Sequence, residues 1–269
     1  MAAVNMKNIT LETGGKSPLL IFDDANLEQA VKWSHVGTSP LPCSHLMPHT
    51  NLLLEGIMSN QGQICTATSR ILVQESVYDA FVAAFSKEVK EVSVVGDPFA
   101  ETSFQGPQVT KTQYERVLSY VEAGKAEGAK LVSGGGEAYT KGPSEGKGFF
   151  ITPTIFTDVK PTMKIYREEV FGPFVVIATF KTEEEAIEMA NDSTFGLGSS
   201  VWTQNLARAH RVAKRIEAGM VWINSSNDSD FRIPFGGVKQ SGIGRELGEA
   251  GLAGYTQIKA VHVNLGWDL

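Results

Sequence analysis

The feature that most constrains the fold of this chain is a regular alternation of short apolar runs and amphipathic stretches that begins at Arg70. Runs such as 71–73 and 220–223 have the length of buried strands, whereas 76–92 carries apolar residues at helical spacing. Strands that alternate with helices favour an open, mainly parallel sheet with helices on its faces. We therefore expect an α/β fold.

The expected elements follow one another without an internal repeat or a linker. Two short strands are expected around the glycines within 7–22, and a helix at 27–36 follows the capping region 23–26. Further strands are expected at 71–73, 130–132, 149–156, 174–180, 199–202, 220–223 and 258–263, and further helices at 76–92, 109–127, 182–191, 206–218 and 245–254.

Length and charge narrow the classes of function. The 269 residues suffice for one large domain or a domain with appendages. A net charge of −6 argues against nucleic acid or an anionic membrane as a partner. No apolar run approaches the roughly 20 residues that span a bilayer. The N-terminus lacks signal-peptide features and two cysteines make no disulfide framework, so we expect a cytoplasmic protein.

A single cysteine lies among small polar residues in the segment 59–70. In such a loop, backbone N–H groups can face the sulfur of Cys65 and a substrate carbonyl fits beside it. A thiolate there would be an effective nucleophile. An isolated cysteine is more often a small buried apolar residue. The loop alone therefore leaves both interpretations open.

A glutamate ends the first strand-like run. Glu12 follows residues 8–11 and precedes the tight turn Gly14-Gly15. A carboxylate at the mouth of a sheet is a candidate general base, and a solvated strand-end residue is the alternative. Lys16-Ser17 after two glycines imitates a phosphate-binding loop, but Thr10 stands where that loop needs glycine.

Four blocks in this order closely resemble the NAD(P)-dependent aldehyde dehydrogenase superfamily: 11–18, 59–70, 168–173 and 234–246. The resemblance runs through nearly the whole chain, with one interruption. It corresponds to about the C-terminal half of a usual family member. It implies an α/β catalytic domain with a C-terminal oligomerisation strand.

The resemblance implies a role for five residues. Cys65 matches the nucleophile that adds to an aldehyde as a thiohemiacetal and, after hydride transfer to nicotinamide, becomes a thioester. Glu12 matches the base that activates water for hydrolysis. Glu169 and Phe171 match residues that hold the nicotinamide ribose and flank the ring; a solvated charge and a core aromatic are the alternatives. Phe235 matches an aromatic position at the substrate pocket.

The implied cofactor is NAD, yet the motifs with which the family binds most of it have no counterpart in this sequence. The family's side-chain oxyanion donor, an asparagine, also has no match, which leaves the N–H of Cys65. Loss of one such donor typically costs about 10²–10³ in rate. We therefore expect an NAD-dependent oxidoreductase that is impaired as this chain. The aldehyde and the preference for NAD over NADP stay open.

Two other functions fit the same residues. One is a non-catalytic remnant or assembly fragment, and the other is a cofactor-free thiol esterase that keeps Cys65 and Glu12. The expected divisions are a cofactor-domain remnant at 1–18, a catalytic domain at 19–244, and a helix with an oligomerisation strand at 245–269. The exposed edge at 258–263 would pair with a second copy. The expected partner is a small aldehyde, with no nucleic acid and no membrane.

Residues 38–56 interrupt the family pattern. They contain three prolines and no helical period, whereas family members usually run from a segment like 34–37 into one like 57–60. We hypothesise translated intron sequence or a gene-model error, and a genuine surface loop is the alternative. Cys43, His45 and His49 match no established zinc spacing, so no metal site is expected.

Overall fold

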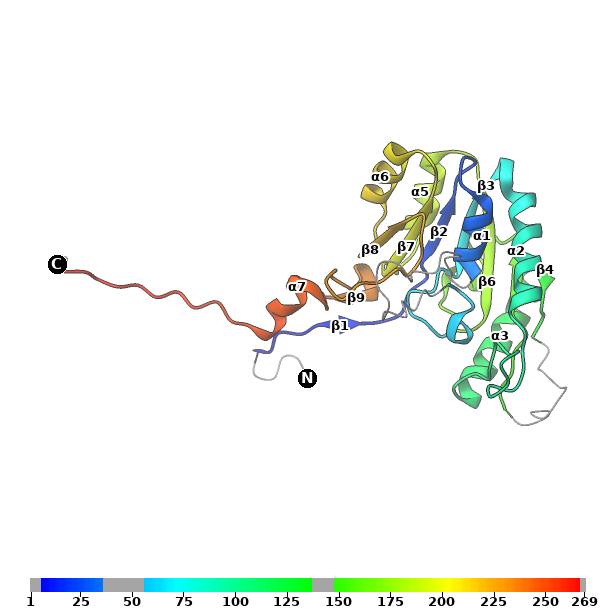
Figure 1. Ribbon diagram of the computed structural model, residues 1–269, viewed down its shortest axis with the longest axis horizontal. Helices are drawn as coiled ribbons and strands as arrows, with labels where there is room; N and C mark the ends of the chain where they lie inside the picture. Colours follow the sequence, from blue (N-terminus) through cyan, green and yellow to red (C-terminus); the bar gives the residue numbers. More distant parts are fainter. Residues whose placement is uncertain (1–5, 36–55, 137–147, 267–269) are drawn as a thin grey trace.

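The fold is centred on a seven-stranded sheet. The computed structural model describes residues 6–35, 56–136 and 148–266 (Figure 1). The strand order is β4-β5-β6-β3-β2-β7-β8, in which only β4 runs antiparallel to its neighbour. The expected α/β class is confirmed. The strands are β2 (Pro18–Ile21), β3 (Arg70–Gln74), β4 (Lys130–Ser133), β5 (Thr154–Thr157), β6 (Phe174–Phe180), β7 (Gly198–Trp202) and β8 (Met220–Ile223).

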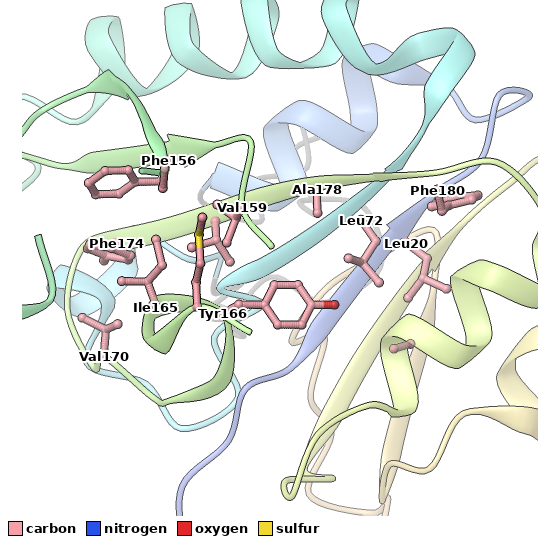
Figure 2. Packing of buried hydrophobic residues seen from close by; sticks show 14 of the residues in the cluster. Leu20, Leu72, Phe156, Val159, Ile165, Tyr166, Val170, Phe174, Ala178 and Phe180 are labelled. Atoms are coloured by element: carbon pink, nitrogen blue, oxygen red, sulfur yellow. The ribbon is translucent and has the colours of Figure 1, made fainter. Parts of the chain in front are cut away.

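Helices cover both faces of this sheet. Side chains alternate along a strand, so Leu19 and Ile21 of β2 face one layer and Leu20 faces the other. The first layer contains α1 (Leu27–His35) and α2 (Tyr78–Val92). The second contains α3 (Lys111–Ala126), α4 (Lys164–Arg167), α5 (Glu183–Asn191) and α6 (Leu206–Arg215). Figure 2 shows part of the second core, with Tyr166 of α4 among residues of β2, β3 and β6.

A buried arginine ties the start of β3 to the end of α5. The guanidinium of Arg70 donates to the carbonyl oxygens of Met189 at 2.9 Å and Ala190 at 2.8 Å. These belong to the last turn of a helix, whose carbonyls lack partners within the helix. The guanidinium also lies 5.0 Å from the ring centre of Tyr166. Arg70 thereby fixes the strand that begins five positions after Cys65.

A small second sheet projects from the main body (Figure 1). β1 (Leu11–Glu12) pairs antiparallel with β9 (Gly242–Ile243), and α7 (Gly248–Leu252) follows. This helix begins later than expected because Leu247 has a φ of 59°, outside the helical range. The strand expected at 258–263 is not formed. Those residues run extended and largely exposed, since a strand needs a neighbour and none pairs with them in the described chain.

Two other boundaries differ from expectation, and the helix α4 was not expected. The strand expected at 149–156 begins at Thr154, which directly follows a proline that has no N–H for a ladder. Helix α6 ends at Arg215 because Ile216 has an extended ψ of 130°. The four residues of α4 are too few to show a helical period.

No helix in the described ranges is long and apolar enough to cross a bilayer.

The hydrogen-bond pattern of α1 resumes after the insertion. The N–H of Ile57 donates to the carbonyl of Ser34, and the N–H of Met58 donates to that of His35, both at 3.0 Å. Each bond spans 23 residues, 19 more than the four that separate donor and acceptor in an α-helix. The two bonds therefore have the pattern of one α-helix with 19 residues inserted in its sequence, the length of 38–56. Residues 38–55 lie outside the described residues.

Candidate active site

The predicted site residues meet at the amino-terminal edge of the parallel strands. Glu12 precedes β2, Cys65 precedes β3 and Glu169 precedes β6, and these strands are neighbours in the order β6-β3-β2. Open α/β sheets more commonly bind ligands at their carboxyl edge. Here a pocket of about 360 Å³ at the amino edge is lined by Glu12, Thr13, Gly14, Cys65, Gln113, Arg116, Glu169 and Phe171. Four of the five predicted residues thus line one pocket.

The double glycine makes this convergence possible. A Cβ on Gly14 would collide with the carboxylate oxygen Oε2 of Glu169, and the N–H of Gly15 donates to Oε1 at 2.9 Å. A Cβ on Gly15 would lie 2.5 Å from the carbonyl oxygen of Cys65, closer than real Cβ atoms approach. The glycines therefore do more than turn the chain. They let the Glu169 carboxylate and the cysteine loop approach the backbone from two sides.

The cysteine loop itself contains strained backbone. Asn60 and Gln61 have φ values of 47° and 55°, in the left-handed region that non-glycine residues seldom occupy. The side chain of Gln63 accepts a hydrogen bond from the N–H of Val109 at 3.0 Å, and that of Gln105 donates to the carbonyl of Met58 at 2.6 Å. The loop is thus held in an uncommon conformation by the segment before α3.

The thiol of Cys65 is half-buried, and its pKa is raised. Burial is the largest cause, and the negative charges of Glu12 and Glu169 act in the same direction. The backbone N–H groups of Thr66 and Cys65 hydrogen-bond to the sulfur and act in the opposite direction. The sulfur therefore has thiolate-stabilising donors beside it, but the chain by itself favours the protonated thiol near neutral pH.

Glu12 has the environment of a base. Burial and then the charge of Glu246 raise the pKa of its carboxyl group, while the charge of Arg245 lowers it. Its Oε1 is buried and has no hydrogen-bond partner among the described residues. A carboxylate that titrates closer to neutral pH is better suited to accept a proton. Neither Glu246 nor Arg245 is among the predicted site residues, because a sequence does not show which charges β9 carries past β1.

Glu169 and Phe171 lie on a second strained segment. Burial is the main cause that raises the pKa of Glu169, opposed by the N–H of Gly15 and the charges of Lys16 and Arg116. Phe171 has a φ of 61°. Its carbonyl accepts a hydrogen bond of 2.6 Å from the side chain of Gln113, which also donates to Val170.

Two residues of the pocket come from a helix that the sequence marks only as amphipathic. Gln113 and Arg116 lie in the first turns of α3, and Arg116 donates to the carbonyl oxygen of Glu169 at 2.9 Å. Their positions are typical of a solvated helix face. The only available signal is a pair of polar residues three positions apart on one face.

Phe235 does not line this pocket. It lines a second hollow of about 260 Å³ beside β8, together with Trp222 and part of the polar loop 225–232. The backbones of Phe235 and Glu246 exchange hydrogen bonds of 2.8 and 2.7 Å. Phe235 is therefore linked to the pocket through the segment that places Glu246 near Glu12.

No cluster of metal-ligating side chains is found within the residues that the structure describes. Cys43, His45 and His49 lie outside those residues. Lys239 donates to the carbonyls of Asn191 and Ser193, and Arg245 donates to those of Gly237 and Gly244. Both side chains hold the C-terminal segment against its surroundings.

Sequence comparison identifies relatives over nearly the whole chain. Residues 1–39 and 46–261 match the aldehyde dehydrogenase family, and the unmatched 40–45 fall within the insertion. An aldehyde dehydrogenase-like protein of Schizosaccharomyces pombe is 52% identical over 98% of this chain. The aldehyde dehydrogenase of Agaricus bisporus and aldehyde dehydrogenase [NAD(P)+] 1 of Saccharomyces cerevisiae are each 47% identical, over 100% and 98% of this chain.

Solved structures show the same fold. The NAD-dependent aldehyde dehydrogenase of Sinorhizobium meliloti superposes with a TM-score of 0.87 and 40% identity, covering 100% of this chain and 48% of its own. The NAD+ complex of the Bacillus cereus enzyme gives a TM-score of 0.86 and 44% identity, covering 98% and 49%. The chain spans about half the length of the curated relatives it matches, 48% in each of the three above.

Proposed function

The chain belongs to the aldehyde dehydrogenase family, and we propose that its pocket carries out the NAD(P)-dependent oxidation of an aldehyde to a carboxylic acid. The observation that supports this most directly is the common pocket of Cys65, Glu12 and Glu169. A nucleophile, a base and a second carboxylate, each placed before one of three neighbouring strands, are the groups that this chemistry needs.

The first step is addition to the aldehyde. The proton of the Cys65 thiol passes to Glu12, directly or through water, and the sulfur bonds to the aldehyde carbon to give a thiohemiacetal. The N–H of Cys65 stabilises the oxyanion. The raised pKa of Glu12 makes its carboxylate the better acceptor, which offsets the raised pKa of the thiol.

A dinucleotide held at Glu169 and Phe171 would supply the hydride acceptor for the thiohemiacetal carbon, and loss of the hydride would leave a thioester on Cys65. Glu12 first releases the thiol proton to solvent and then takes a proton from a water molecule, whose oxygen attacks the thioester. The carboxylic acid forms as the Cys65 thiolate leaves, and the thiolate recovers its proton from Glu12. One aldehyde, one oxidised dinucleotide and one water give one acid, one reduced dinucleotide and one proton. Cys65 and Glu12 are both restored.

The residues present fit one end of such a cofactor. The Glu169 carboxylate, set on Gly15, can accept hydrogen bonds from ribose hydroxyls, and Phe171 offers an aromatic face to a ring. Arg116 adds a cation at the rim of the same pocket. The chemistry of these groups suits a nicotinamide riboside, and we match no site for the rest of the dinucleotide among the described residues.

The proposed divisions follow the predicted ones, with residues 1–18 allied to a cofactor domain, 19–244 catalytic and 245–269 used for assembly. Ile258 and Val263 of the extended C-terminal arm are 104% and 70% exposed. Their backbone is free to pair with a second copy of the chain. A non-catalytic assembly fragment is the alternative that this arm favours, and a thiol esterase is the one that the Cys65–Glu12 pair favours.

Activity assays separate these functions. The full chain is mixed with NAD+ or NADP+ and short aldehydes while reduced dinucleotide is followed by absorbance, with an ester substrate in parallel. Reduction that is lost in Cys65→Ser and kept in Cys43→Ser supports the proposal. Ester turnover without reduction would favour the esterase, and neither activity would favour the assembly fragment.

A further inference from the structure

The mechanism does not use Lys16, a buried ionisable side chain that lies next to the pocket glycines. Lys16 follows the double glycine and is 1% exposed. Its Nζ has no hydrogen-bond partner among the described residues. A buried ammonium group without partners is strongly unfavourable, so a lysine at this place calls for a reason beyond packing. Its long methylene stem alone could be replaced by methionine.

The charges around Lys16 come from two parts of the fold. Glu169 and Glu168 follow α4 and favour its protonated form, whereas Arg70 at the start of β3 disfavours it. Burial is the largest influence and lowers the pKa of Lys16 to about 7. The interaction with Glu169 is mutual, since the charge of Lys16 also favours the ionised form of that carboxylate.

A small cavity adjoins this lysine. It measures about 10 Å³ and is lined by Lys16, Ser17, the start of β7 and the residues after α6. A polar cavity of roughly 10–15 Å³ holds one water molecule. The hydroxyl of Ser17 is also buried without a partner among the described residues. Lys16 and Ser17, whose polar atoms have no hydrogen-bond partner among the described residues, thus both line a cavity that is large enough for one water molecule.

We propose that Lys16 is a positioning residue for Glu169, whose buried ammonium group, solvated by one water in this cavity, keeps the Glu169 carboxylate ionised and seated on the N–H of Gly15. The two contacts act from neighbouring residues, Gly15 through its N–H and Lys16 through its charge. The relevance of the coupling between Lys16 and Glu169 to cofactor binding rests on the function proposed above. The coupling itself does not depend on that function.

A double-mutant cycle tests the coupling. Unfolding constants are measured in urea for the full chain, Lys16→Met, Glu169→Gln and the double variant, at about pH 6 and about pH 9, on either side of the Lys16 titration. We expect a coupling on the order of tenfold in the unfolding constant at the lower pH and its loss at the higher one. Lys32→Met, at a half-buried lysine of α1 that pairs with Glu28, is the control and should show no coupling to Glu169.

Lys16→Arg sharpens the test, because a guanidinium group keeps its charge at both pH values. Coupling should then persist at about pH 9. A coupling that is equal at both pH values in the parent chain, or absent at both, would overturn the proposal. A purely structural role of the stem would give a pH-independent result.

A second measurement needs no variant of Lys16. The protein is labelled with carboxyl-¹³C glutamate, and Glu169→Gln assigns the resonance. The proposal predicts a second inflection in the Glu169 titration where Lys16 loses its proton. A single inflection would overturn it. Neither measurement uses cofactor or aldehyde, so an inactive chain leaves this proposal standing, and its failure leaves the proposed activity standing.

Discussion

Carboxylates lie at both edges of the central sheet, but their surroundings differ. At the carboxyl edge, the carboxylate of Asp24 accepts from the hydroxyl of Thr203 at 2.7 Å and from Arg208 at 3.2 Å. Glu183 pairs with Arg211 through two bonds of 2.6 and 2.7 Å, which lowers its pKa. At the amino edge, Glu12 and Glu169 have raised pKa values and line an open pocket.

This difference shows what burial does to a carboxylate to which no arginine donates a hydrogen bond among the described residues. A carboxylate paired with arginine stays ionised and contributes to stability, while one that is partly buried and lacks such a partner titrates closer to neutral pH. The carboxyl edge is therefore built for stability and the amino edge for chemistry.

The largest expected effect comes from exchanging one carboxylate at each edge for an amide. Glu12→Gln removes the proposed base and should lower aldehyde oxidation by about 10²–10⁴-fold. Asp24→Asn should leave turnover nearly unchanged and cost about 1–2 kcal/mol of unfolding free energy, because it weakens charge-assisted bonds. Rates of dinucleotide reduction and urea unfolding measure the two quantities. Equal losses of turnover in both variants would remove the distinction between the edges.

The next effect concerns the cradle of Glu169. Gly14→Ala places a methyl group where the Glu169 carboxylate lies, so that carboxylate must move. We expect a loss of about 2–3 kcal/mol in unfolding free energy from overpacking, together with weaker binding of reduced dinucleotide by fluorescence. Gly254→Ala is the matched control, because nothing lies within 4 Å of its added Cβ and its φ is ordinary. A neutral Gly14→Ala would show that the cradle is not tight.

Acid should lower the stability of the fold in two separate pH windows, one set by His35 and one by Glu183. His35, at the end of α1, is fully buried, and burial lowers its pKa from 6.5 to about 4. The unfolded chain then binds more protons between these values, so stability falls as the pH drops from 6.5 to about 4, by up to about 3 kcal/mol. The contribution of Glu183, whose pKa is lowered, is lost only as the pH falls below its ordinary value of 4.5.

Unfolding curves across this range measure the first window directly. The ring nitrogen Nε2 of His35 bonds to the hydroxyl of Ser93 at 2.7 Å, which a glutamine can replace. In His35→Gln the loss of stability above pH 4.5 should largely disappear. Arg211→Ala should change the pH dependence of the unfolding free energy only below pH 4.5. An unchanged upper window in His35→Gln would assign it to other groups.

The smallest expected effect is a gain. Deleting 38–56 should restore a continuous helix from α1 to Ile57 and stabilise the chain by about 2 kcal/mol, the closure entropy of a loop of this size. Deleting 38–55 or 37–56 shifts the donors by one residue, about 100° around the helix, and should not reproduce the gain. Melting temperatures compare the three. Equal gains in all three would show that the helical register is not what the insertion interrupts.

The sequence predicted most of the fold because its strands and helices have clear periods, and it predicted four pocket residues because each lies within a distinctive block. It did not reveal Gln113 and Arg116, since their helix resembles any solvated helix. The roles of Arg70 and Lys16 were hidden because a sequence does not show that a charge is buried. The strand expected at 258–263 failed for a different reason: its pattern is that of a strand, but no strand of the described residues pairs with it.

The most direct test of the central claim, that Cys65 shares one pocket with two carboxylates, is the pH dependence of its alkylation by iodoacetamide. Measured in Cys43→Ser, the rate should rise with a midpoint above that of an ordinary thiol, because burial and the charges of Glu12 and Glu169 raise the pKa of Cys65. Glu12→Gln and Glu169→Gln should each move the midpoint to lower pH. A midpoint that neither substitution moves would contradict the account, since the carboxylates would then not face the sulfur.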